Sequence, residues 1–277
     1  MASTRLTLAE EFTVASMQGA YASTAVGRGG QLNAVSIGVY YFDGKGGISG
    51  SSIINLPDRR FGARSITNRS ITGTYDVDPD GAGYGTTHLT VINPDGSTEE
   101  SQTILLVTKA EKVDGVSIAQ ELSLMQTEIE PVTGSLFMHT MIRRPDNARF
   151  TLASFQGVYG GPGIAWNGQT PMSAMGIGAV HFDGAGMFTG VDLQNLPGET
   201  FRDRKVLTFE TPTGRYLVDE NGTGMIIGNL DAKARLIVTR ARLVEGKTEA
   251  LGYFFVMDDL IPGTGNFITT YITKRFY

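Results

Sequence analysis

The chain has 277 residues, of which 36 are glycine and none is cysteine, and only 18% of its residues are charged. Typical domains contain roughly 7% glycine and about 25% charged residues. The hydrophobic content of 41% is sufficient for a packed core, which argues against intrinsic disorder, and the glycines follow no collagen period. The absence of cysteine excludes disulfides, thiolate metal ligands and a thiol nucleophile.

The charge pattern also limits the classes of partner. The formal net charge is −5 and the chain has no basic run, so nucleic acid is not an expected partner. No stretch of about 18 apolar residues is present, which predicts no membrane span. The opening residues MASTRLTLAEEFTV carry acidic side chains where a signal peptide has its apolar core, so the expected location is the cytoplasm.

The sequence repeats itself once. FTVASMQGAY (12–21) returns as FTLASFQGVY (150–159), and YFDGKGGISG (41–50) returns as HFDGAGMFTG (181–190). TGTYDVDPDGAG and TGRYLVDENGTG match at an offset of 141, whereas LVTKAEKVDG and IVTRARLVEG match at an offset of 131. The second copy has therefore lost ten residues from one hairpin. We expect two domains, residues 1–145 and residues 146–277.

Each copy predicts strands separated by tight turns. In chain order, the first copy has eight short segments rich in β-branched and aromatic residues: FTVASMQGAYAS, NAVSIGVYYF, GISGSSIINL, ITGTYDV, THLTVI, QTILLVT, SIAQELSLMQTEI and GSLFMHTMI. Turn sequences such as DGKG, DPDGAG and NPDG lie between them. A meander of this size usually closes into a barrel, which removes its free edges. The sequence therefore predicts an all-β protein of two tandem antiparallel eight-stranded meander barrels.

The hairpin signatures carry a family resemblance. A unit of about 130 residues, with a first strand ending in Gly-x-Tyr and a Phe-Asp-Gly-x-Gly hairpin after the second, occurs in both copies. It resembles the calycin-like barrels, and among them the allene oxide cyclase-like proteins and the small β-barrel cyclases of polyketide biosynthesis. The resemblance implies apolar ligands bound inside the barrel and cyclisation or isomerisation without a cofactor. It assigns no catalytic residue to this chain.

Three residues are candidate catalytic groups. Tyr41 and His181 occupy equivalent positions in the two copies, and Glu121 alternates with apolar residues on a strand. An imidazole titrates near neutral pH, and a buried carboxyl has a raised pKa, so each could transfer a proton. The alternatives are strand-end residues beside an Asp-Gly turn for Tyr41 and His181, and an exposed carboxylate for Glu121. Alternation alone does not decide which face of these strands is inside the barrel.

Four further residues are candidate substrate contacts. Tyr21 and Tyr159 are shared by both copies, which also fits a packing role. Trp166 is the single tryptophan and lies in the loop that distinguishes the second copy, where it either covers a pocket or lies between the repeats. His139 has no histidine counterpart, because Thr270 takes its place.

No metal or cofactor site is expected. The three histidines are far apart in the sequence, which does not suit a zinc site. The run Asp76-Val-Asp78-Pro-Asp80-Gly81 resembles the start of a calcium-binding loop, but Thr87 stands where the bidentate Glu is required. A solvated hairpin turn is the simpler interpretation of this segment.

Two functions of different classes fit these observations. The first is a cofactor-independent isomerase, cyclase or lyase that holds an apolar or polyketide-like small molecule in a barrel pocket, where one Tyr, His or Glu transfers a proton. The second is a non-catalytic carrier of hydrophobic ligands, or a barrel pair used for assembly. Either function is compatible with a homo-oligomer. An accessible cavity with buried ionisable groups favours the enzyme, whereas filled barrels favour the second class.

Overall fold

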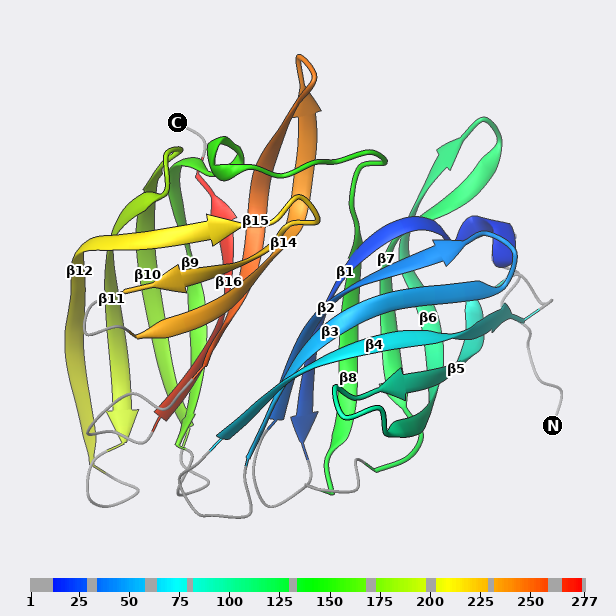
Figure 1. Cartoon of the computed structure of the whole chain (residues 1–277), viewed down its shortest axis with the longest axis horizontal. Helices are drawn as coiled ribbons and strands as arrows, with labels where there is room; N and C mark the ends of the chain where they lie inside the picture. The colour runs from blue at the N-terminus through cyan, green and yellow to red at the C-terminus, as the bar shows by residue number, and fades with distance from the viewer. Residues whose placement is uncertain are drawn as a thin grey trace, which may run out of the picture.

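The computed structural model describes residues 12–28, 34–57, 64–78, 82–129, 134–167, 173–197, 203–228, 232–258 and 266–275. These residues form two closed antiparallel barrels of eight strands each, in sequence order (Figure 1). The predicted fold class is therefore confirmed. The strands of the first barrel end before the expected boundary at residues 145 and 146, and those of the second begin after it.

Each barrel is a meander closed by pairing between its first and last strands. The first barrel consists of β1 (Gln18–Arg28), β2 (Ala34–Asp43), β3 (Gly47–Pro57), β4 (Arg64–Val77), β5 (Tyr84–Ile92), β6 (Thr98–Val113), β7 (Val116–Gln126) and β8 (Leu136–Arg143). The second consists of β9 (Gln156–Asn167), β10 (Ser173–Asp183), β11 (Met187–Pro197), β12 (Arg204–Val218), β13 (Thr223–Ile227), β14 (Lys233–Val244), β15 (Lys247–Met257) and β16 (Asn266–Lys274). β13 is shorter than β5, as the lost residues of the second copy predict.

The repeated Phe-Asp-Gly-x-Gly sequence forms the β2–β3 hairpin. The Asp43 carboxylate accepts hydrogen bonds from the backbone N–H groups of Lys45 and Gly47, at 2.7 and 2.8 Å. Gly44 and Gly46 adopt positive φ, which L side chains rarely do. These backbone hydrogen bonds lower the pKa of the Asp43 carboxyl. Asp183 makes the equivalent bonds in the second barrel, so this motif is explained by turn geometry.

A short 3₁₀ turn closes one end of each barrel. In the first barrel the turn Val14–Ser16 is held by Tyr75, whose hydroxyl donates to the carbonyl oxygens of Val14 and Met17, both at 2.9 Å. The turn Leu152–Ser154 has the same contact with Tyr216. Aromatic and aliphatic side chains pack beneath each turn, among them Met17, Tyr21, Phe42 and Tyr75 in the first barrel and Phe155, Tyr159, Phe182 and Tyr216 in the second. Three of these aromatic positions in each barrel carry the same residue in both copies, so shared residues lie at the closed ends.

The two barrels lie side by side and are joined by an apolar contact (Figure 1). The outer side chains of β1 and β2 pack against those of β14 and β15, in a cluster of Ala22, Val35, Ile37, Val39, Ile237, Phe254 and Val256. This packing settles the orientation of β2. Its Val35, Ile37 and Val39 point outward to the second barrel, and Ser36, Tyr40 and Phe42 point into the first.

Candidate functional site

A cavity of about 130 Å³ lies inside the first barrel, beyond the aromatic closed end. An engineered protein cavity of about 150 Å³ accommodates benzene, which sets the scale of a fitting molecule. Its apolar wall comes from strands around the barrel and includes Ile54, Ile71, Leu89, Leu124, Phe137 and Met141. Its polar lining includes Ser36, Tyr40, Ser52, Arg69, Thr103, Gln126 and His139. The cavity therefore suits a small molecule with an apolar body and a polar group.

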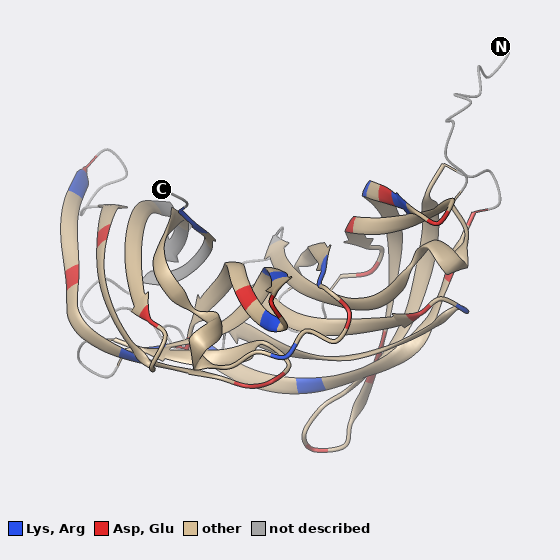
Figure 2. Ribbon diagram, turned by 90° about the horizontal axis from the view of Figure 1, so that it is seen from above, with Lys and Arg blue, Asp and Glu red and all other residues tan. Residues whose placement is uncertain are grey.

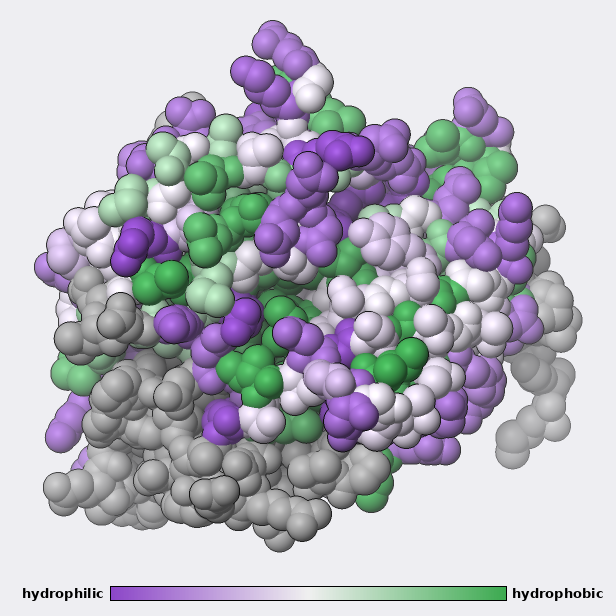
Figure 3. Space-filling view, viewed as in Figure 1, coloured by the Kyte–Doolittle hydropathy of each residue, from purple (hydrophilic) through white to green (hydrophobic). Residues whose placement is uncertain are grey.

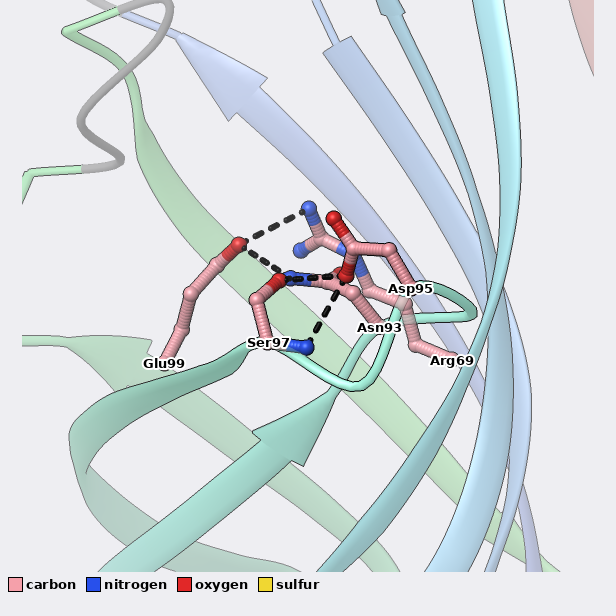
Figure 4. A network of polar contacts seen from close by, with 5 residues as sticks. All are labelled: Arg69, Asn93, Asp95, Ser97 and Glu99. Atoms are coloured by element: carbon pink, nitrogen blue, oxygen red, sulfur yellow. Dashed lines mark hydrogen bonds and ion pairs between the residues drawn. The ribbon is translucent and has the colours of Figure 1, made fainter.

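Arg69 of β4 extends into this cavity and pairs with Glu99 of β6, with 3.5 Å between Nη2 and Oε1 (Figure 4). The Arg69 side chain is only 11% exposed. Its Nε is buried and has no hydrogen-bond acceptor among the described residues. A buried donor without an acceptor costs stability, so this N–H is a specific place for a ligand oxygen.

The hairpin between β5 and β6 positions Glu99. Asn93 donates from Nδ2 to Glu99 Oε1 at 2.8 Å and to Ser97 Oγ at 3.1 Å, and Ser97 in turn donates to Asp95 Oδ1 at 2.6 Å (Figure 4). These bonds fix the hairpin and orient its carboxylate toward Arg69. The ten residues that the second copy lacks fall in this hairpin, and the described residues of the shorter β13–β14 hairpin show no counterpart of the network.

His139 of β8 is half-buried in the cavity wall. Its Nδ1 lies 3.3 Å from Ser23 Oγ. Burial lowers the pKa of the His139 imidazole from 6.5 to about 4, because removal from water disfavours the charged form. The ring is therefore neutral at pH 7, the form that can accept a proton.

Tyr40 of β2 also lines the cavity and carries an ionisable hydroxyl. Burial raises the pKa of its hydroxyl, and the hydrogen bond with Ser52 and the positive charge of Arg69 only partly oppose this. Tyr40 therefore stays protonated and can donate a hydrogen bond.

The charge of the lining opposes anionic ligands. Glu99, Glu100 and Glu128 line the cavity against the single guanidinium of Arg69, while His139 is neutral. Since Arg69 is already paired with Glu99, a ligand carboxylate would meet two further carboxylates without a free cation. The cavity favours an uncharged oxygen, such as a carbonyl or hydroxyl group.

These polar residues belong to the first copy alone. Register places Gly176 at the position of Ser36, Val180 at that of Tyr40 and Phe209 at that of Arg69, and Thr270 matches His139. The second barrel instead holds Asp192, whose carboxyl pKa is raised by burial, bonded to Gln194. The two barrels thus share a fold and not a set of interior polar groups.

The three candidate catalytic residues lie outside this cavity. Tyr41 lies on the outward face of β2 and is 46% exposed. His181 is exposed and lines an open groove of about 410 Å³ on the outer surface of the second barrel. Glu121 lies at the contact between the barrels, where its Oε1 is 3.0 Å from Arg240 Nη2 and 3.9 Å from Lys109 Nζ. The structure does not bring these three residues together, and their catalytic roles stay predictions.

The candidate substrate contacts are also dispersed. Tyr21 and Tyr159 are fully buried at the closed ends, and their hydroxyls donate to the carbonyl oxygens of Ala119 and Ala250 at 2.7 and 2.8 Å. Trp166 lies on β9, but its side chain is outside the part that the structure describes. His139 alone lies in the cavity wall of the first barrel.

Sequence reasoning missed Arg69, Tyr40 and Glu99. A signal was present, because Glu99 lies in the hairpin that is ten residues longer in the first copy, and Arg69 stands where the other copy has an apolar residue. Their meeting inside one barrel could not be read from the sequence, because it depends on which strand face points inward.

The remaining features concern metal ligands, membrane-spanning helices and the distribution of charge. Among the described residues, no group of three or more His, Asp or Glu side chains is arranged to hold a metal ion. Of the calcium-like run, residues 79–81 lie outside the described part. None of the helices in the described segments has the length and apolarity needed to cross a membrane. Charged residues of both signs are interspersed along the ribbon in the view of Figure 2.

Comparisons with known proteins leave the family open. No protein-family model matches the chain, and no curated protein matches it. Among solved structures, a DUF1329 family protein from Desulfovibrio piger matches with 9% sequence identity and a TM-score of 0.18, covering 94% of this chain and 85% of that chain. So low a TM-score supports no argument about fold or function. Of the predicted resemblance, the two eight-stranded barrels are confirmed, and membership of a calycin or allene oxide cyclase family is not.

Proposed function

We propose that the first barrel binds a small uncharged carbonyl compound and catalyses a cofactor-independent isomerisation or ring-forming step on it. The observation that carries the proposal is the presence of Arg69 and His139 in the lining of one cavity, the first with a buried unpaired N–H and the second with a neutral imidazole. The size of the cavity suits a six-membered ring.

The proposed chemistry is a redox-neutral proton transfer. His139 removes a proton from the carbon next to the ligand carbonyl, and the electron pair of that C–H bond forms an enolate. Arg69 Nε–H and the Tyr40 hydroxyl donate hydrogen bonds to the enolate oxygen, where negative charge develops. The imidazolium then returns the proton to a different carbon, which moves the double bond and leaves the enzyme unchanged.

A carrier function is the second candidate. The Ser23 contact of 3.3 Å is the one hydrogen bond of His139 among the described residues, so no carboxylate orients this imidazole as a base. A pocket that binds the same compounds without turning them over would be a transport or storage site.

Turnover of a cyclohexenone probe distinguishes the two functions. The β,γ-unsaturated isomer of cyclohexenone fits the size of the cavity, and its conversion to the conjugated isomer is followed by ultraviolet absorbance. The enzyme function predicts catalysed conversion, which His139→Gln and Arg69→Gln each reduce by about 100-fold. His88→Gln and Arg149→Gln are matched controls, because both residues are exposed on outer surfaces. Saturable binding of the probe without conversion favours the carrier, and absence of binding contradicts both functions.

A further inference from the structure

The contact between the two barrels joins two different faces of the repeated unit. The first barrel contributes outer side chains of β1–β3, among them Ile37, and the second contributes those of β14 and β15, among them Ile237 and Val256. By the repeat, β9–β11 of the second barrel correspond to β1–β3, and β6 and β7 of the first barrel correspond to β14 and β15. Each barrel therefore has one face that the partner barrel covers and one face that it leaves uncovered.

The uncovered face of the second barrel is apolar. Met175 and Ile177 of β10, which match Val35 and Ile37, are 66% and 63% exposed, although their counterparts in the first barrel are buried. Leu193 of β11 is 42% exposed and pairs with Ile177. Monomeric proteins rarely expose clustered aliphatic side chains of this kind.

The uncovered face of the first barrel is apolar as well. Ile104 of β6, Met125 of β7 and Met138 of β8 are cross-strand neighbours and are 40%, 47% and 59% exposed. Met125 occupies the position of Val256 in the repeat, which is buried in the contact between the barrels. Apolar side chains reach the surface of both barrels in the view of Figure 3.

A repeated asparagine gives an independent indication of the occupant. Asn55 is braced by Arg64, whose Nε donates to Asn55 Oδ1 at 2.5 Å, and its own Nδ2 donates to the Met257 carbonyl of the other barrel at 2.7 Å. Asn195 has the same brace from Arg204, at 2.8 Å. Within the described segments, however, no acceptor contacts its Nδ2. The amide that joins the two barrels within the chain thus has a counterpart, Asn195, on the uncovered face of the second barrel.

We propose that a second copy of this chain covers these faces, with β9–β11 of one chain docked on β6–β8 of the next. This contact between chains repeats the contact between barrels within the chain. Gln126 is the counterpart of Met257 in the first copy, so Asn195 Nδ2 of one chain donates to the backbone carbonyl of Gln126 in the next. Because the two docking faces differ, the interface is head-to-tail, and it forms a ring if the rotation closes and a filament if it does not.

Light scattering after size-exclusion chromatography tests this assembly on the full chain. The wild-type chain is expected to be larger than a monomer at micromolar concentration. Ile177→Lys and Met125→Glu each place a charge in one docking face and are expected to weaken association by at least about tenfold. Leu217→Lys is the matched control, because Leu217 is 57% exposed on β12, away from both faces. Circular dichroism confirms that each variant keeps its strands.

Mixing the two face variants gives the decisive result. At a concentration where each variant alone is monomeric, an equimolar mixture retains one intact pair of faces, the β9–β11 face of Met125→Glu and the β6–β8 face of Ile177→Lys. The mixture is therefore expected to form a dimer and nothing larger. A wild-type chain that stays monomeric at hundreds of micromolar would overturn the proposal. So would continued self-association of Met125→Glu, because it would show that the β9–β11 face pairs with itself.

Discussion

Arg240 of the second barrel lies 3.0 Å from Glu121 of the first, between Nη2 and Oε1. This ion pair lies beside the apolar contact that β1 and β2 make with β14 and β15. The Glu121 side chain is 25% exposed and the Arg240 side chain is 46% exposed, so water screens the interaction.

Replacement of Glu121 by Gln separates a structural from a catalytic role. Because exposed ion pairs contribute little, Glu121→Gln is expected to lower the free energy of unfolding by less than about 1 kcal/mol. Turnover of the cyclohexenone probe should not change, because Glu121 lies outside the cavity. Urea denaturation and the absorbance assay measure the two effects. A loss of turnover with unchanged stability would return Glu121 to the catalytic candidates.

The Arg69–Glu99 pair is expected to behave non-additively. Glu99→Leu leaves a guanidinium that is 11% exposed without its counter-ion, and should destabilise the first barrel by about 2–3 kcal/mol. In the double variant Arg69→Met/Glu99→Leu no buried charge remains, so it should be more stable than Glu99→Leu alone. Equilibrium unfolding in urea gives the comparison. Equal losses for the single and double variants would show that the unpaired guanidinium is not the cause of the loss.

Because His139 is buried in its neutral form, the free energy of unfolding depends on pH. The unfolded chain takes up a proton on this residue near pH 6.5, whereas the folded protein does so only near pH 4. The stabilisation is therefore complete above pH 6.5 and falls as the pH drops from 6.5 to 4, by about 3 kcal/mol in total. His139→Gln should remove this component.

Urea midpoints at pH 7 and pH 5 measure the difference, since most carboxyl groups titrate below this interval. His88→Gln is the control and should retain the wild-type dependence, because His88 is exposed on the outer face of β5. A His139→Gln variant with the wild-type slope would show that folding does not lower the pKa of His139.

The fold could be predicted from the sequence because its determinants are local. The Asp43 turn and the Asp183 turn each specify a hairpin through backbone hydrogen bonds within four residues, and their repetition indicates two similar units. The strands between such turns are short and β-branched, and an eight-strand meander has few alternatives to closure.

The candidate site could be predicted only in part. His139 differs from Thr270, its counterpart in the second copy, and so the sequence indicates it, but the sequence indicates Tyr41 of the outward face of β2 and not Tyr40 of the inward face. The inward face of β2 is set by the packing of its other face against β14 and β15, which brings together residues about 200 positions apart. Strand alternation cannot tell which face of β2 points inward when the residues of both faces are apolar or small. The contact between the barrels decides it, because it covers the outward face.

Histidine ring signals provide the most direct test of ligand binding in the first barrel. The chain has three histidines, so a sample labelled with nitrogen-15 in histidine gives one set of ring signals for each. Titration with cyclohexenone is expected to shift the His139 signals saturably and to leave those of His88 and His181 unchanged. Arg69→Gln should weaken this response. A titration that leaves the His139 signals unchanged, or that moves only those of His181, would contradict a ligand site inside the first barrel.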